Sequence, residues 1–286
     1  MLKDLFSIKH RQLPWIISVV FSALAAFFIA QFAVAVAVGG VLAAIGKSSE
    51  IDTFLGSDSY WPKVVIYFFI YALMVVIIFQ LMRFWRWIEK RSDSGAAGAI
   101  VEKKKQKKTS GSYVRESIRF FKLDTLPSAK QFLEVILYFV MYMITMLFVG
   151  GLLQLVKVIN VDQKQDLGVS PPIGVSSVVA VAIIFVVLPP ICEEILFRGY
   201  LYNKLRQFAP LGLSVLLTSV LFGIAHLEYG NLNWVAAVDT FVFSLYLIFV
   251  SQKHQSLYSA IMLHALKNGL AMTLFVTGIQ ATSLLK

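Results

Sequence analysis

Long apolar runs joined by short polar links make up most of this chain, and few charged positions interrupt them. A run of about 20 apolar residues is long enough to cross the hydrocarbon core of a bilayer as a helix. Seven runs fit this description, give or take one: Trp15–Ile45, Val64–Met82, Phe132–Val156, Val175–Leu188 (continuing toward Arg206), Pro210–His226, Trp234–Val250 and Leu257–Gly278. The alternating pattern of a membrane β-strand is absent. The sequence therefore predicts an all-α, polytopic transmembrane helical bundle of about seven spans.

The composition agrees with this pattern. Of the 286 residues, 58% are hydrophobic and 15% are charged, whereas ordinary soluble domains carry about 25% charged residues. We therefore expect an integral, multi-pass membrane protein. The first run, Trp15–Ile45, exceeds the roughly 7–15 apolar residues of a signal-peptide core, so we expect it to remain as the first span.

Basic residues are concentrated in one connecting segment, Arg83–Lys130, which holds 13 Lys/Arg against 5 Asp/Glu. Positive charge beside a span favours the cytoplasmic side, so this segment and the N-terminus are expected to be cytoplasmic. Residues 1–130 then form a two-span region with a basic loop, and residues 131–286 form a second, catalytic core. Each lysine near an anionic surface contributes about 1 kcal/mol, so anionic lipids are an expected partner of the loop. The basic loop lacks the interleaved aromatic residues of a nucleic-acid-binding module, so no nucleic-acid partner is expected. The simpler alternative to lipid binding is that the loop only sets the topology of the protein.

Two adjacent carboxylates, Glu193 and Glu194, follow Pro189 and Pro190 at the end of an apolar run. Charge in such a setting is costly and usually serves chemistry. Because proline is tolerated in the first helical turn, we expect a helix to restart here, with both glutamates in that turn beside free N–H groups. Cys192, the single cysteine, excludes an intramolecular disulfide and is interpreted as a small packing residue.

Three residue pairs are each spaced by four positions, so each pair shares one helix face. They are Glu194 with Arg198, Phe222 with His226, and His264 with Asn268. Each pair taken alone also has a purely structural interpretation. The glutamate and arginine could be a buried structural ion pair, and each histidine could be a hydrogen-bonded core residue. Arg198 is expected to hold Glu194 ionised, which leaves Glu193 as the more easily protonated base.

The depth of these residues in the bilayer favours a shared site. Glu193 lies 15 residues before Phe208 and His226 lies 18 after it. Two antiparallel helices with a rise of about 1.5 Å per residue return them to within about 5 Å in depth. By the same argument, His264 is expected lower than His226 unless the helices tilt.

The three pairs also carry a resemblance to a known family. Glu193-Glu194-Ile195-Leu196-Phe197-Arg198 resembles an EExxxR motif, Phe222-Gly223-Ile224-Ala225-His226 an FxxxH motif, and His264-Ala265-Leu266-Lys267-Asn268 an HxxxN motif. In this order they are similar to the motifs of the CAAX protease and bacteriocin-processing (CPBP, or Abi) intramembrane proteases, relatives of the type II CAAX prenyl endopeptidase. The resemblance covers roughly Ser176–Thr273.

The resemblance implies an intramembrane endopeptidase in a bacterial cell membrane, cutting a membrane-embedded or prenylated, lipidated peptide. By position, Glu193 would be the general base aided by His226. His264 and Asn268 would bind the oxyanion, and Glu194 with Arg198 would hold the site in shape. The resemblance leaves the cofactor open between none and a divalent metal such as zinc. The chain lacks the HExxH signature, which favours a metal-free or weakly metal-dependent reaction.

Two alternatives belong to other functional classes. A non-proteolytic membrane protein, acting in immunity or as a scaffold, could keep the fold without turnover. A proton-coupled transporter could use the intramembrane charges as a relay, although paired broken helices in inverted halves are its usual sign and only one broken helix is predicted. Lys267, inside the third motif, is unexpected in lipid, and Asp239 in the preceding span is its candidate partner.

Overall fold

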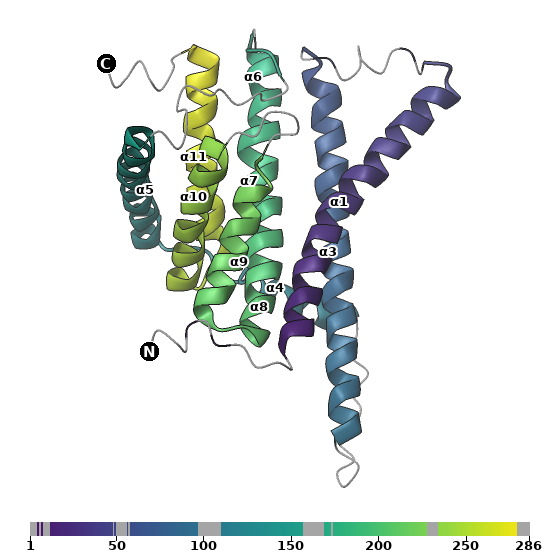
Figure 1. The fold of residues 1–286 in the computed structure, drawn as a ribbon. Helices are drawn as coiled ribbons and strands as arrows, with labels where there is room; N and C mark the ends of the chain where they lie inside the picture. The colour runs from purple at the N-terminus through teal and green to yellow at the C-terminus, as the bar shows by residue number, and fades with distance from the viewer. Residues whose placement is uncertain are drawn as a thin grey trace.

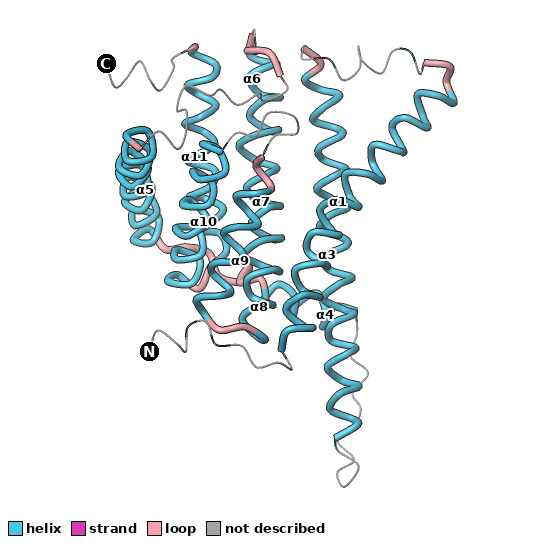
Figure 2. The backbone as a smooth tube through the Cα atoms, in the orientation of Figure 1, coloured by secondary structure: helices cyan, strands magenta, loops and turns pink. Residues whose placement is uncertain are grey.

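The computed structural model describes residues 12–47, 58–96, 110–156, 169–172, 174–227 and 234–278, together with positions 5, 7, 49 and 56. All regular structure in these residues is helical (Figure 2). The uninterrupted helices are α1 (Leu13–Ala44), α3 (Tyr60–Ala96), α4 (Ser110–Phe120), α5 (Ala129–Leu155), α9 (Leu211–Ile224), α10 (Trp234–His254) and α11 (Leu257–Thr277). The lysine-rich stretch of the basic loop, residues 103–108, lies outside the described part.

Six helices of the described chain have the length and apolar composition of a membrane span. They are α1, α3 over Tyr60–Glu89, α5, the helix Val175–Phe208, α10 and α11, and the apolar α9 is a shorter seventh. Large apolar side chains face outward on several of them, including Phe21, Phe32 and Phe148 at 72% exposure each, as expected of helices that contact lipid. The prediction of a multi-pass helical membrane bundle of about seven spans is confirmed.

The helix Val175–Phe208 lies at the centre of the bundle (Figure 1). Helix α3 packs along one side of it, and α1 crosses α3 and leans away from it toward its own C-terminal end. Helices α10 and α11 pack on the other side, with α5 outermost. The central helix can therefore present side chains to α3 and to α11 at the same level.

The central helix changes geometry along its length. Its parts are α6 (Val175–Ala182), the π-helical η4 (Ile183–Val187), α7 (Leu188–Glu194), the π-helical η5 (Ile195–Tyr202) and α8 (Asn203–Phe208). Pro189 and Pro190 stand in the first turn of α7, as the sequence predicts. The chain nevertheless continues as one helix, because the wider π turns accommodate positions where proline supplies no N–H.

The expected position of the glutamates in the first turn of that helix is wrong. Glu193 and Glu194 are the last two residues of α7, and its first turn holds no acidic residue. They lie about one turn beyond the first-turn N–H groups of α7, so those groups cannot donate to their carboxylates. Side chains of neighbouring helices take that role instead.

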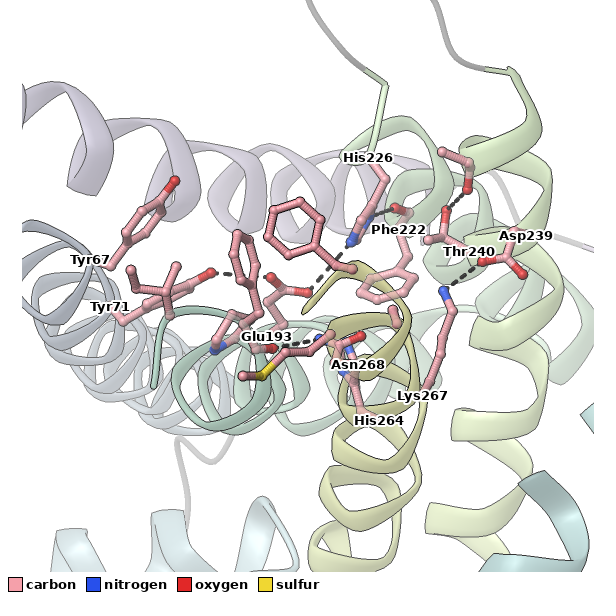
Figure 3. Close-up of a pocket in the computed structure, with 17 residues that line it drawn as sticks. Tyr67, Tyr71, Glu193, Phe222, His226, Asp239, Thr240, His264, Lys267 and Asn268 are labelled. Atoms are coloured by element: carbon pink, nitrogen blue, oxygen red, sulfur yellow. Dashed lines mark hydrogen bonds and ion pairs between the residues drawn. The ribbon is translucent and has the colours of Figure 1, made fainter. Parts of the chain in front are cut away.

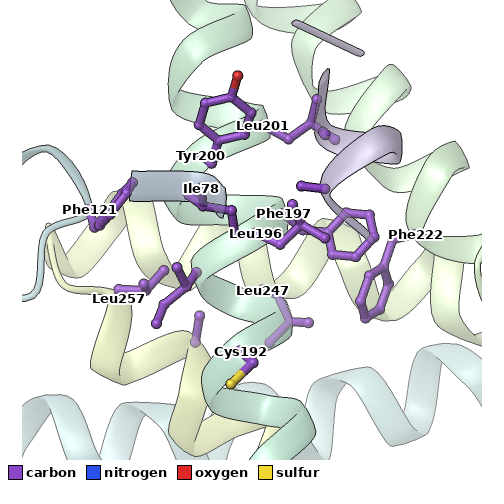
Figure 4. Close-up of a cluster of buried hydrophobic side chains, with 14 of the residues drawn as sticks. Ile78, Phe121, Cys192, Leu196, Phe197, Tyr200, Leu201, Phe222, Leu247 and Leu257 are labelled. Atoms are coloured by element: carbon purple, nitrogen blue, oxygen red, sulfur yellow. The ribbon is translucent and has the colours of Figure 1, made fainter. Parts of the chain in front are cut away.

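A compact apolar cluster packs around the central helix beside the glutamates and on their C-terminal side (Figure 4). All eight residues of η5 are buried, and Tyr200 and Leu196 are at most 1% exposed. Phe121, from the turn after α4, packs so closely that a Cβ on Gly199 would come within 3.2 Å of its ring. Cys192 is buried within the same cluster, in agreement with its predicted packing role.

Candidate active site

Glu194 is completely buried and is held by two nitrogen donors. Arg198 Nη1 lies 2.8 Å from its Oε1 atom, one helical turn along the same helix. His264 Nδ1, from α11, lies 2.9 Å from the same oxygen. Arg198 also donates from Nη2 to Ser244 Oγ of α10 at 2.7 Å. The predicted pairing of Glu194 with Arg198 is therefore present, and it joins the central helix to α10 and α11.

Glu193 faces a different histidine (Figure 3). Its Oε2 atom lies 3.8 Å from His226 Nε2, which confirms that the two residues meet at one depth. His226 Nδ1 contacts the carbonyl oxygen of Phe222 at 2.8 Å. Because a carbonyl only accepts, Nδ1 carries the hydrogen, and in the neutral ring Nε2 is then an acceptor. A carboxylate oxygen and an imidazole nitrogen, both acceptors, thus face each other.

A cavity of about 350 Å³ opens beside these two acceptors. Glu193, His226, His264 and Asn268 all line it (Figure 3), whereas Glu194 and Arg198 are not among its lining residues. Within the described chain, Glu193 Oε2 has no hydrogen-bond partner. A water molecule in the cavity could donate one hydrogen to Glu193 and the other to His226, and would then be activated as a nucleophile.

The other two motif residues reach the same cavity from α11. His264, although expected at a lower level, contacts Glu194 directly. Asn268 lies one turn further along α11, and its Nδ2 atom donates to the carbonyl oxygen of Phe185 at 2.8 Å. All six predicted site residues are therefore gathered on three neighbouring parts of the bundle: the central helix, the end of α9 and α11.

Comparison with known families identifies the segment that carries this geometry. Residues 175–270 match the family described as Rce1-like, type II CAAX prenyl endopeptidase Rce1-like. The match covers about a third of the chain, and at the level of the family it supports a CAAX-type intramembrane protease. No curated protein and no solved structure matches the chain.

The Rce1-like segment does not contain every side chain at the cavity. Tyr71, on α3, donates from its hydroxyl to Glu193 Oε1 at 3.3 Å, and its ring stacks against Tyr67 with centroids 6.3 Å apart. Neither tyrosine was predicted as a site residue, because both stand in an apolar span with no motif around them. Since α3 lies in the N-terminal region, that region supplies part of the wall of the cavity (Figure 3). The division of the chain at residue 130 stays a prediction.

An ion pair lines the same cavity on the side of α10. Lys267 Nζ lies 2.6 Å from Asp239 Oδ2, so the pair predicted from the sequence is present. Asp239 also accepts a hydrogen bond from the hydroxyl of Tyr142 on α5. Both charged side chains are partly exposed in the cavity, at 20% for Lys267 and 25% for Asp239. The Rce1-like site therefore contains a matched pair of charges beside its catalytic candidates.

The donor atoms do not fit a zinc site. In the described residues, no three His, Cys, Asp or Glu side chains converge as metal ligands would. Glu193 and His226 face the cavity, whereas His264 turns its Nδ1 atom to Glu194. A catalytic zinc needs three protein ligands and one open position. The metal dependence of the protein stays a prediction.

Proposed function

We propose that this protein is an intramembrane endopeptidase in which Glu193 activates a water molecule to hydrolyse a peptide bond. The observation that supports the proposal best is the pair of acceptors, Glu193 Oε2 and His226 Nε2, that face each other at the cavity. A base positioned in this way typically contributes a factor of about 10²–10⁴ to the rate.

In the proposed first step, a water molecule bound between Glu193 and His226 transfers a proton to Glu193. Its oxygen forms a bond to the carbonyl carbon of the peptide, and the carbonyl oxygen becomes an oxyanion. Glu193 then gives that proton to the leaving amine as the carbon–nitrogen bond breaks. Tyr71 holds the second oxygen of Glu193, which keeps Oε2 turned toward the cavity.

His264 and Asn268 are the proposed donors for the oxyanion. Glu194 holds the Nδ1 edge of His264, so Nε2 is the ring nitrogen left for the substrate. When His264 is doubly protonated, Nε2 donates to the oxyanion, and the Glu194 carboxylate stabilises the charged ring. Each donor aimed at an oxyanion typically contributes a factor of about 10²–10³.

The proposed substrate is a membrane-embedded peptide or a prenylated or otherwise lipidated protein. The matched family is named for a prenyl endopeptidase, and the cavity lies among helices of membrane-spanning length. The segment Arg83–Lys130, with lysines at positions 103–105, 107 and 108, is the proposed contact for anionic lipids at the cytoplasmic surface.

A turnover assay with purified protein tests this function. The substrates are a prenylated, fluorescence-quenched peptide and the same peptide without the lipid. We expect the wild type to cut the prenylated peptide faster, and Glu193→Gln to lose turnover by about 100-fold or more. Glu134→Gln is a matched control, because Glu134 pairs with Lys253 at 2.7 Å outside the cavity.

Two results would count against the proposal. Full turnover in Glu193→Gln would remove the assignment of the base. A folded wild type that binds the lipidated peptide but cuts nothing would favour the non-proteolytic alternative, a binding or scaffolding protein.

A further inference from the structure

The two prolines of the central helix leave the carbonyl group of Phe185 without a helical donor. A carbonyl at position i receives the N–H of residue i+4 in an α-helix and of residue i+5 in a π-helix. For Phe185 these residues are Pro189 and Pro190, neither of which has an N–H. Leu188, the remaining close candidate, donates to Ile183 instead. A carbonyl left without a donor inside a helix bundle is costly.

Asn268 supplies the missing donor from another helix. Its Nδ2 atom lies 2.8 Å from the carbonyl oxygen of Phe185, and both residues line the catalytic cavity. The contact between the helices is close at this level, since a Cβ on Gly269 would lie 3.8 Å from Val186. Helix α11 is thus joined to the central helix at the point where the prolines interrupt its hydrogen bonding.

This bond has a consequence for the catalytic groups. On α11, His264 precedes Asn268 by one turn, about 6 Å along the axis. His264 contacts Glu194 of the central helix, so two bonds on one face of α11 fix how far it can slide against α7. Without the hydrogen bond from Asn268 to Phe185, α11 can slide along the central helix. A displacement of about 1 Å in a catalytic group can lower the rate by about 100-fold.

We propose that Asn268 is a positioning residue, whose amide replaces the missing proline N–H at Phe185 and thereby holds His264 in register with the two glutamates. The proposal rests on the proposed peptidase function for its effect on turnover and on the geometry alone for its effect on stability. The second hydrogen of the same amide stays available to the oxyanion.

A double-mutant cycle of Asn268→Ala and Pro189→Ala in the full-length protein tests the bond. Pro189→Ala restores an N–H four residues after Phe185, so the helix can satisfy its own carbonyl. We expect Asn268→Ala to lower the thermal unfolding midpoint in detergent by about 3–8 °C when Pro189 is present. In the Pro189→Ala background we expect less than about half of that loss. Equal losses in both backgrounds would overturn the proposal.

The same four proteins are then compared in the turnover assay. Asn268→Ala removes the oxyanion donor as well as the register, so it is expected to lower kcat by about 1,000-fold or more with little change in KM, and adding Pro189→Ala is expected to restore about tenfold of that loss. Restored stability without restored kcat would overturn the positioning role. If the wild type cuts no peptide, the proposed function fails, while the unfolding cycle still decides whether the bond exists.

Asn203 provides the matched control for this experiment. Its Nδ2 atom also donates to a backbone carbonyl, that of Phe120, at 3.0 Å, but outside the cavity. Asn203→Ala is expected to lower the unfolding midpoint by a similar amount, and Pro189→Ala should restore none of that loss. Restoration of both variants to the same degree would mean that Pro189→Ala stabilises the protein generally, and would contradict the specific bond.

Discussion

Replacing Arg198 with methionine is expected to destabilise this protein severely. The side chains of Arg198 and Glu194 are both 0% exposed, and their closest nitrogen and oxygen are 2.8 Å apart. Methionine is also a long side chain but removes the charge, so the Glu194 carboxylate stays buried with His264 Nδ1 as its remaining donor. In the described chain, Glu194 Oε2 has no hydrogen-bond partner that could compensate.

The size of the effect follows from the cost of an unpaired buried charge. Removing one partner of a buried ion pair costs about 3–5 kcal/mol. His264 Nδ1 remains as a donor to Glu194 and offsets part of that cost, so we place the loss near the lower end, at about 3 kcal/mol. In a chain of this size each kcal/mol lowers the unfolding midpoint by about 2–4 °C, which gives a decrease of about 6–12 °C.

Thermal unfolding in detergent, followed by tryptophan fluorescence, measures this loss in Arg198→Met, in Glu194→Gln and in the double variant. The double variant removes both charges, so its loss should be smaller than the sum of the single losses by about 1–3 kcal/mol. The partly exposed pair Arg86 and Glu116 is the control, and Glu116→Gln should cost less than about 1 kcal/mol. Strictly additive losses at Arg198 and Glu194 would refute the reasoning.

Four further predictions concern the cavity and the topology. Tyr71→Phe removes the hydrogen bond to the base and should lower kcat several-fold at unchanged KM, whereas an unchanged kcat would show that the base does not need this bond. Asp239→Asn should impair turnover by leaving Lys267 unpaired, and adding Lys267→Met should restore part of it; a double variant no better than Asp239→Asn alone would contradict the pairing argument. Excess EDTA should leave most of the turnover in place, and its complete loss, reversed by zinc, would overturn the metal-free mechanism. A cysteine at Ser94, in a Cys192→Ala background, should be labelled from the cytoplasmic side only, and labelling from outside intact cells would reverse the proposed topology.

The sequence predicted the level of the catalytic groups well because helical rise is regular. Counting residues from the turn at Phe208 placed Glu193 and His226 within about 5 Å in depth, and their facing atoms lie 3.8 Å apart. Asp239 lies 5 residues after Trp234 and Lys267 lies 11 before Gly278, the expected outer ends of their two apolar runs, and this counting leaves them offset by about 9 Å along the axis. Their charged atoms are nevertheless 2.6 Å apart, because a long lysine side chain and helix tilt can close such an offset.

Three features of the site could not be predicted in this way. The central helix continues through the prolines by way of π-helical segments, so Glu193 and Glu194 end α7 and do not stand in the first turn of a restarted helix, and no residue pattern marks such a segment. Tyr71 is one of several aromatic residues in an apolar span, and only the packing of α3 against α7 selects it. The bond from Asn268 to Phe185 joins a side chain to a backbone carbonyl, which leaves no signature in the side chain at position 185.

Adjacent glutamates can hold different roles because consecutive residues of a helix point about 100° apart. Glu194 turns toward Arg198, and Asp239 is paired with Lys267, so each of these carboxylates has a cation within 2.8 Å. Among these five charged groups, Glu193 is the one without a directly paired cation, and it lines the cavity together with His264, the proposed cationic donor to the oxyanion. In the proposed reaction a proton from water neutralises the charge of Glu193 as the oxyanion forms. The negative charge therefore moves from Glu193 to the substrate while the net charge of the site stays constant, which avoids creating a new charge in a low-dielectric environment.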